Sequence, residues 1–221
     1  MLVFFYGGGW NSGRRQDYAF VGQALASRGF LCVVPDYRLV PQVRYPAFVE
    51  DAASAVRWTR DHAARYGGDP DRIMLSGHSA GAYIALQTAL DTTFLSQAKV
   101  DPAIIRAVAG LSGPYDFLPL DVAESQAAFG GYFDLPSTQP INHVRPGAPP
   151  AFLAHGSKDT LVRLRNTLNL GHALEAAGDV VEIKVYQGLS HPDTVLALSR
   201  PFRGRAPILA DMTNFLMAHS G

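Results

Sequence analysis

Apolar runs alternate along the chain with longer stretches in which apolar residues recur at helical spacing. The apolar runs are short enough for buried strands. They cover residues 2–5, 30–34, 72–76, 107–112, 151–155 and 180–186. The helical stretches cover residues 17–28, 48–66, 80–90, 165–177 and 206–218. This alternation predicts an α/β fold, with a mostly parallel sheet flanked by helices on both faces.

The pentapeptide Gly77-His78-Ser79-Ala80-Gly81 lies where one predicted strand meets a helix. A Gly-x-Ser-x-Gly turn in this context holds the serine hydroxyl above the edge of the sheet. The turn brings other backbone too close for a Cβ at the two glycines, and the helix adds the positive end of its dipole. We therefore expect Ser79 to be a nucleophile, the alternative being a glycine-rich turn that merely contains a serine.

A nucleophilic serine needs a base, and the base needs an acid that orients it. With this turn the chain order is Ser, then Asp or Glu, then His. Asp159 and His191 each come just past a later predicted strand, so both are expected at the same sheet edge as Ser79. Asp116, after an earlier strand, is an alternative acid, although the strand order favours Asp159. The remaining histidines are expected to be solvated or locally bonded, and His78 to point away from the nucleophile.

Three consecutive glycines, Gly7 to Gly9, follow the strand predicted at residues 2–5. Glycines let backbone N–H groups turn toward a developing alkoxide without side chains in the way. This loop is therefore a candidate oxyanion hole, and its place in the chain is that of an HGGG-type loop. Trp10 and Tyr83 adjoin the two motifs and are candidates for binding substrate, with core packing as the alternative.

With these motifs the chain resembles the α/β-hydrolases of the esterase/lipase group related to hormone-sensitive lipase. It is also similar to small bacterial carboxylesterases and to kynurenine formamidase-like enzymes. The segments that match that group between the glycine loop and the serine turn are residues 35–39, 45–47, 50–52 and 67–73. The resemblance implies the α/β-hydrolase fold, and it implies that the backbone N–H groups of Gly8, Gly9 and Ala80 form the oxyanion hole. It also implies that Asp36 braces this loop.

The chain departs from the resemblance in two places. Tyr6 stands where the group usually has a histidine before its glycines, and its hydroxyl is expected to fix the loop by a hydrogen bond. Relatives usually carry two further strands before the strand at residues 2–5, so these first strands are expected to be absent or to lie upstream of Met1. The run at residues 30–34 would then be an edge strand without charges, and such edges invite pairing. We therefore expect a homo-oligomer that buries this edge, or a poorly soluble chain.

Composition agrees with one α/β-hydrolase domain over residues 1–221, with a small cap or surface excursion at residues 115–150. The 221 residues are 48% hydrophobic and 17% charged, with a formal net charge of zero, which gives no basic surface for nucleic acid. The lone Cys32 allows no disulfide and no cysteine metal cluster. The opening lacks the basic leader and apolar core of a signal peptide, and no apolar run reaches the ~20 residues of a membrane span. A cytoplasmic protein without membrane partners is expected.

Together these features predict a serine hydrolase, a carboxylesterase that cleaves small short-acyl esters through an acyl-enzyme intermediate. No metal and no organic cofactor are implied. An arylformamidase-like amidase would use the same catalytic residues and is an alternative. A non-catalytic small-ligand-binding protein on a hydrolase fold is a second alternative, against which the complete Ser, Asp and His set argues.

Overall fold

A single six-stranded sheet runs through the computed structural model, which describes residues 1–221. The strands are β1 (Leu2–Phe5), β2 (Cys32–Val33), β3 (Ile73–His78), β4 (Ile105–Leu111), β5 (Ala151–Gly156) and β6 (Val181–Tyr186). Their order across the sheet is β2-β1-β3-β4-β5-β6, and every neighbouring pair is parallel. The predicted α/β class with a parallel sheet is confirmed.

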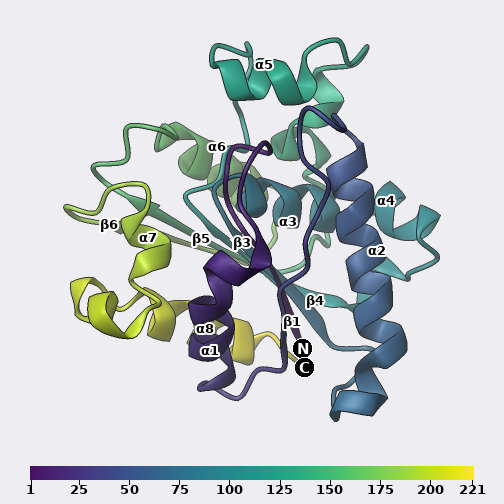
Figure 1. Ribbon diagram of the computed structural model, residues 1–221, viewed down its shortest axis with the longest axis vertical. Coiled ribbons are helices and arrows are strands. Elements are labelled where there is room, and N and C mark those ends of the chain that lie inside the picture. The colour runs from purple at the N-terminus through teal and green to yellow at the C-terminus, as the bar shows by residue number, and fades with distance from the viewer.

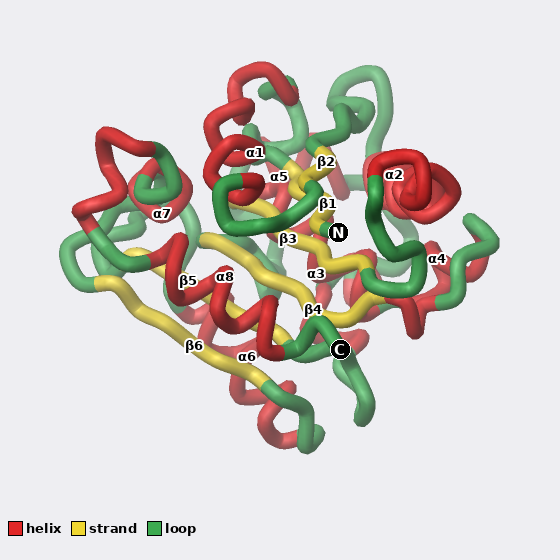
Figure 2. Tube along the Cα trace, turned by 90° about the horizontal axis from the view of Figure 1, so that it is seen from below, coloured by secondary structure: helices red, strands yellow, loops and turns green.

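Helices cover both faces of this sheet (Figures 1 and 2). They are α1 (Ala19–Ala26), α2 (Ala47–His62), α3 (Ala80–Leu90), α4 (Thr92–Gln97), α5 (Ala123–Phe129), α6 (Arg165–Ala176), α7 (Asp193–Leu196) and α8 (Ile208–Ala218). Helices α2, α3 and α6 pack on one face, and α1, α7 and α8 pack on the other. Short 3-10 helices lie at Arg15–Tyr18, Ala63–Tyr66, Pro102–Ile104, Pro136–Thr138, Pro140–His143 and Arg200–Arg205. None of the helices combines the length and the apolar character needed to cross a membrane.

The alternation of side chains along β1 divides the core in two. Val3 and Phe5 belong to the apolar cluster under α2 and α3, whereas Leu2 and Phe4 belong to the cluster under α1 and α8. All four side chains are fully buried. This follows from the two-residue repeat of a strand, and it explains why a strand covered on both faces is apolar at every position.

Three predicted elements differ most clearly from the observed ones. The helix expected at residues 17–28 is a 3-10 turn followed by α1, and the one expected at 48–66 is α2 followed by a 3-10 turn. The apolar run at 30–34 gives only the two-residue strand β2, because only Leu2 and Val3 of β1 pair with it. Strand β2 is an edge, as expected, but so short an edge strand is one way in which proteins limit pairing. A homo-oligomer through it stays a prediction.

The chain order places a topological switch between β1 and β3. From β1 the chain moves outward to β2, then returns past β1 to β3 and continues to β6 on the other side. Ligands of open α/β sheets bind outside the carboxyl ends of the strands at such a point. The glycine loop follows β1 and Ser79 follows β3, so both lie at the switch. The excursion between β4 and β5, which contains α5, extends over the same edge (Figure 1).

Candidate active site

Ser79 stands alone between β3 and α3 in a strained backbone conformation, with φ of 55° and ψ of −123°. Two close backbone approaches explain the flanking glycines. A Cβ at Gly77 would lie 2.2 Å from the carbonyl oxygen of Gly81, and a Cβ at Gly81 would lie 2.1 Å from that of Phe5. Strain of this kind is held only where the surrounding structure determines it, and here it lifts the serine side chain off the sheet.

The side chains of Ser79, His191 and Asp159 are joined by hydrogen bonds in one row. The Nε2 of His191 lies 2.8 Å from Oγ of Ser79, and its Nδ1 lies 2.7 Å from Oδ2 of Asp159. The side chain of Asp159 is fully buried and that of His191 is 9% exposed. Because an ionised carboxylate only accepts, Nδ1 of His191 donates to Asp159, and Nε2 is left to accept from the serine hydroxyl.

The loop that follows β5 fixes the carboxylate of Asp159. Its Oδ1 accepts the backbone N–H groups of Leu161 and Val162, both at 2.9 Å. Burial pushes the pKa of Asp159 upward, but the hydrogen bonds from His191 and Val162 outweigh it and the pKa is lowered. Asp116, the alternative acid, lies elsewhere, where its Oδ2 accepts from the side-chain amide of Asn169 at 2.6 Å.

Positive φ angles shape the glycine loop after β1. Gly8 has φ of 135° and Gly9 has φ of 57°. A Cβ at Gly8 would lie 2.2 Å from the backbone oxygen of Ser12, whose N–H and hydroxyl both donate to the carbonyl of Gly8. Gly8, Gly9 and Ala80 line the same cavity as Ser79. The structure therefore brings the three residues expected to form an oxyanion hole to the cavity of Ser79.

Two stacked tyrosines anchor the start of this loop. The rings of Tyr6 and Tyr37 stack with centroids 4.5 Å apart, and the hydroxyl of Tyr37 donates to the carbonyl of Tyr6 at 2.8 Å. Burial is the largest cause of the raised pKa of Tyr6, and the nearby Asp36 carboxylate raises it further. Asp36 in turn accepts from the backbone and guanidinium of Arg15. The ring of Tyr6 packs beside the loop as expected, but the hydrogen bond that fixes the loop comes from Tyr37.

This arrangement predicts different outcomes for two matched substitutions. Tyr37→Phe leaves a buried carbonyl without its donor and is expected to lower the free energy of unfolding by about 1–3 kcal/mol and to reduce turnover. Tyr6→Phe keeps the stacked ring and is expected to change turnover less than about two-fold, since no loop hydrogen bond is lost. Thermal unfolding and steady-state ester hydrolysis measure both effects. A larger loss for Tyr6→Phe than for Tyr37→Phe would contradict this account.

The cavity beside Ser79 has a volume of about 490 Å³. Its apolar wall is formed by Trp10, Phe117, Val122, Leu161 and Val162. Its charged residues, at the loops and helix ends around it, are Asp121, Glu124, Arg163 and Arg165. Arg163 pairs with Asp121 at 3.2 Å and so joins the loop after Asp159 to the excursion that carries α5. Most of these residues carry no sequence motif. Trp10 is predicted to bind substrate from its place beside the glycine loop, and Phe117 lies in the excursion that is expected to form a small cap.

Tyr83 does not line this cavity, which corrects the expectation that it binds substrate. It is fully buried, its hydroxyl donates to the carbonyl of Thr138 at 2.8 Å, and its ring contacts Trp10 edge-on at 5.5 Å. It supports Trp10 from the core because α3 is buried along its whole length. The aromatic residues of the excursion at residues 115–150 also differ in position. Phe117 lines the cavity, whereas Phe129 packs in the core.

Two further histidines lie against the central row. The ring of His78 lies 4.9 Å from that of His191, so the expectation that His78 points away from the site is wrong. His155 is fully buried; its Nδ1 bonds with the hydroxyl of Thr167 and its Nε2 donates to the carbonyl of Val162, both at 2.9 Å. Burial lowers the pKa of His155. His155 is locally bonded, as expected, and steadies the loop that holds Asp159.

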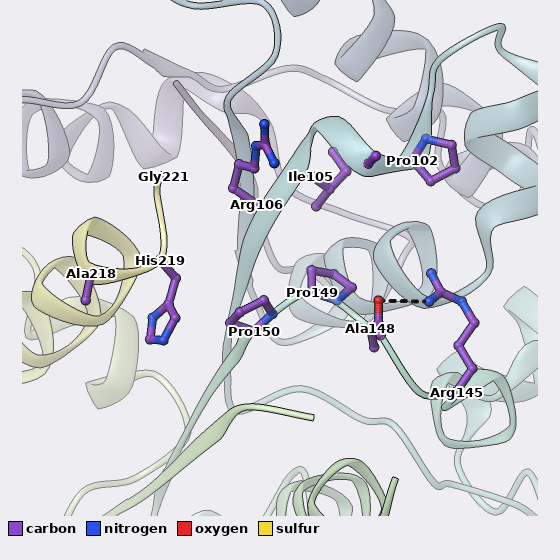
Figure 3. Close-up of a pocket in the computed structure, with 12 residues that line it drawn as sticks. Pro102, Ile105, Arg106, Arg145, Ala148, Pro149, Pro150, Ala218, His219 and Gly221 are labelled. Carbon is purple, nitrogen blue, oxygen red and sulfur yellow. Dashed lines mark hydrogen bonds between the residues drawn. The ribbon is translucent and has the colours of Figure 1, made fainter. Parts of the chain in front are cut away.

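A second cavity, of about 620 Å³, lies near the amino end of β4 and the end of α8, away from the carboxyl ends of the strands (Figure 3). Its two guanidinium groups, those of Arg106 and Arg145, lie on opposite sides of it and donate to the carbonyls of Asp71 and Gly147. They do not converge on a common point. Nowhere does the structure gather three or more His, Cys, Asp or Glu side chains that could hold a metal ion.

One family model and many known proteins match this chain. The sequence model of the BD-FAE family matches residues 1–174. Isoprenylcysteine alpha-carbonyl methylesterase ICME of Arabidopsis thaliana is 30% identical over 96% of this chain and 54% of that protein. Esterase LipQ of Mycobacterium tuberculosis is 31% identical over 80% of this chain and 46% of its own length. The chain spans about half the length of the curated relatives it matches.

Solved structures of esterases share the fold. Apo esterase 2 of Thermogutta terrifontis superposes with a TM-score of 0.78 and 28% identity, covering 98% of this chain and 80% of that one. The expected α/β-hydrolase fold is confirmed by this likeness.

Proposed function

We propose that this chain, which belongs to the BD-FAE family of α/β-hydrolases, is a serine carboxylesterase that acts through an acyl-enzyme intermediate. The observation that carries the proposal is the row Ser79, His191 and Asp159, bonded at 2.8 and 2.7 Å beside a cavity of about 490 Å³. A nucleophile, a base that touches it and a buried acid that orients the base are what acyl transfer requires.

In the proposed reaction Oγ of Ser79 attacks the ester carbonyl carbon while its proton passes to Nε2 of His191. The tetrahedral intermediate collapses as His191 returns this proton to the leaving alkoxide, which departs as the alcohol. Water then attacks the acyl-enzyme with the same base, and the acid and free Ser79 are released. Asp159 holds the Nδ1–H tautomer of the imidazole and stabilises the imidazolium that forms in both halves.

The negative oxygen of each tetrahedral intermediate is assigned to the backbone N–H groups of Gly8, Gly9 and Ala80. These residues line the cavity around Ser79, and the N-terminus of α3 adds a favourable dipole. Backbone donors fixed before the reaction cost little reorganisation when the charge develops, and removal of one such donor typically costs about 10²–10³-fold in kcat.

The relatives support ester cleavage and short acyl groups. The matching proteins of Mycobacterium tuberculosis and Arabidopsis thaliana include esterases LipQ and LipC and the methylesterase ICME. The Thermogutta terrifontis esterase has been solved with propionate bound, with butyrate bound and phosphonylated by sarin. We take small carboxylic esters as the substrate class of this chain, with an apolar acyl group placed against Trp10 and Phe117.

Acyl length is expected to decide the rate. The excursion over the site contains only short helices, which are α5 and two 3-10 turns, so we expect no large lid that opens at an oil surface. Soluble p-nitrophenyl acetate and butyrate are therefore expected to turn over faster than the dodecanoate, without activation above the solubility limit of an ester. Initial rates across the series, below and above that limit, measure this. Faster turnover of emulsified long-chain triglyceride than of soluble butyrate would contradict it.

Labelling with a fluorophosphonate tests the mechanism apart from the substrate. The wild-type chain is expected to form a one-to-one adduct whose modified peptide contains Ser79, and phenyl butyrate hydrolysis is expected to fall in step with labelling. A chain that binds small esters without labelling or hydrolysis would be a binding protein, and the proposal would then be wrong.

A further inference from the structure

The main-chain carbonyl of His191 is held from two sides by buried side chains. Nε2 of His78 lies 3.1 Å from this oxygen, and the hydroxyl of Thr194 donates to it at 3.0 Å. A carbonyl oxygen only accepts, so Nε2 of His78 must carry its hydrogen and donate. His78 is 5% exposed and Thr194 is fully buried, so both hydrogen bonds are shielded from water.

The two donors belong to elements far apart in the sequence. His78 ends β3, whereas Thr194 lies in α7, and Ser112, just past β4, bonds to the hydroxyl of Thr194 at 3.0 Å. Because the Thr194 hydrogen is used on His191, the Ser112 hydroxyl is the donor to Thr194. Ser112 is fully buried with φ of 51°, an unusual value for a residue other than glycine. The hydrogen bonds thus run from the strained Ser112 through Thr194 to the carbonyl of His191.

The imidazole of His78 fills the space between the glycine loop and His191. A Cβ at Gly7 would lie 2.9 Å from Nδ1 of His78, and this buried Nδ1 has no hydrogen-bond partner. Burial, followed by the effect of His191, lowers the pKa of His78 to about 3, while Asp159 and the bond to the His191 carbonyl push it upward. A neutral His78 places no positive charge beside the imidazolium that forms on His191.

We propose that His78 and Thr194 are positioning residues, which together hold the backbone of His191 so that its imidazole reaches both Ser79 and Asp159. The inference rests on the proposed function for its kinetic consequence, but the placement of the His191 imidazole can be followed without activity through its hydrogen bond to Asp159. Either donor satisfies the carbonyl, so loss of one leaves the oxygen partnered. Loss of both leaves a buried acceptor unpaired, which is much more costly.

The test is a double-mutant cycle with His78→Leu and Thr194→Val. Each single substitution is expected to lower kcat by about 3- to 10-fold with KM within about two-fold, and the double to lower it by more than the product of the singles. His78→Gln keeps an amide N–H that can reach the carbonyl and is expected to stay within about three-fold of wild type. Thr59→Val is the matched control, because Thr59 is equally buried and donates to Ala55 in α2; it is expected to leave kcat unchanged.

A readout independent of activity accompanies the cycle. The low-field proton signal of the His191–Asp159 hydrogen bond is expected in wild type and in Thr59→Val, and to be lost or shifted in the double variant. Should His78→Leu fail to fold, the cycle is run with His78→Ala, which removes the same donor with less bulk. Retained kcat and an unchanged proton signal in the double variant would overturn the inference while leaving the esterase standing. An inactive wild type whose proton signal still depends on His78 and Thr194 would instead overturn the proposed function and support the positioning.

Discussion

Ser79→Ala is expected to lower kcat for soluble short-acyl esters by about 10³-fold or more, and His191→Ala by a similar factor. Oγ of Ser79 lies 2.8 Å from Nε2 of His191, and in the proposed reaction each group needs the other. The double variant is expected to be little worse than either single one, since residues that act as a unit lose the same stabilisation only once.

Steady-state kinetics with p-nitrophenyl butyrate measure these losses, and thermal unfolding checks that the variants are folded. Ser190→Ala is a useful control, because Ser190 is the neighbour of His191 and its hydroxyl donates to Asp193 rather than to the row. It is expected to retain far more activity than His191→Ala. If Ser79→Ala keeps a tenth of wild-type activity, Ser79 is not the nucleophile.

The meeting of Ser79, Asp159 and His191 could be predicted because it follows from strand order and local turns. Ser79 follows β3 directly, and Asp159 and His191 lie in the loops after β5 and β6. Because the carboxyl ends of parallel strands meet on one side of the sheet, three recognised apolar runs place three distant residues together. The glycine loop could be predicted because it also follows a strand and consists of glycines. The structure gives the physical cause, since backbone approaches Gly8 too closely for a Cβ. These are constraints that individual residue types carry in the sequence.

The features that could not be predicted depend on contacts between distant segments. Tyr37 holds the glycine loop through a hydrogen bond to Tyr6, and nothing local distinguishes it from other buried tyrosines. The turn at Ser79 curves so that the preceding His78 lies under the base, which alternation along a strand does not indicate. Val122 and Leu161 line the cavity from two irregular segments without periodicity. The sequence does not separate Tyr83 from the serine motif beside it. Ala80 of that motif lines the cavity, whereas Tyr83, one turn later in α3, is buried in the core.

Asp159→Asn is expected to lower kcat by about 10²- to 10⁴-fold, whereas Asp116→Asn is expected to change it less than about three-fold. Asp159 accepts Nδ1–H of His191 at 2.7 Å, while Asp116 is bonded to Asn169 at 2.6 Å and does not touch the base. An asparagine at position 159 can present its amide nitrogen to Nδ1, and the imidazole would then turn its hydrogen-bearing Nε2 toward Ser79, where it could no longer accept the hydroxyl proton.

The charge of Asp159 adds to this geometric effect. Burial raises its pKa, but the hydrogen bonds from His191 and Val162 prevail and lower it, so the carboxylate is ionised at neutral pH. In the proposed reaction this negative charge stabilises the imidazolium of His191. A folded-state pKa below the unfolded value contributes stability above the unfolded pKa, and this stability is lost as pH falls through the folded one. Wild type is therefore expected to lose its stability advantage over Asp159→Asn as the pH falls below about 4. Kinetics at pH 7 and unfolding curves between pH 3 and 7 test both expectations.

A greater loss of kcat for Asp116→Asn than for Asp159→Asn would reverse the assignment of the acid while leaving Ser79 and His191 in their roles.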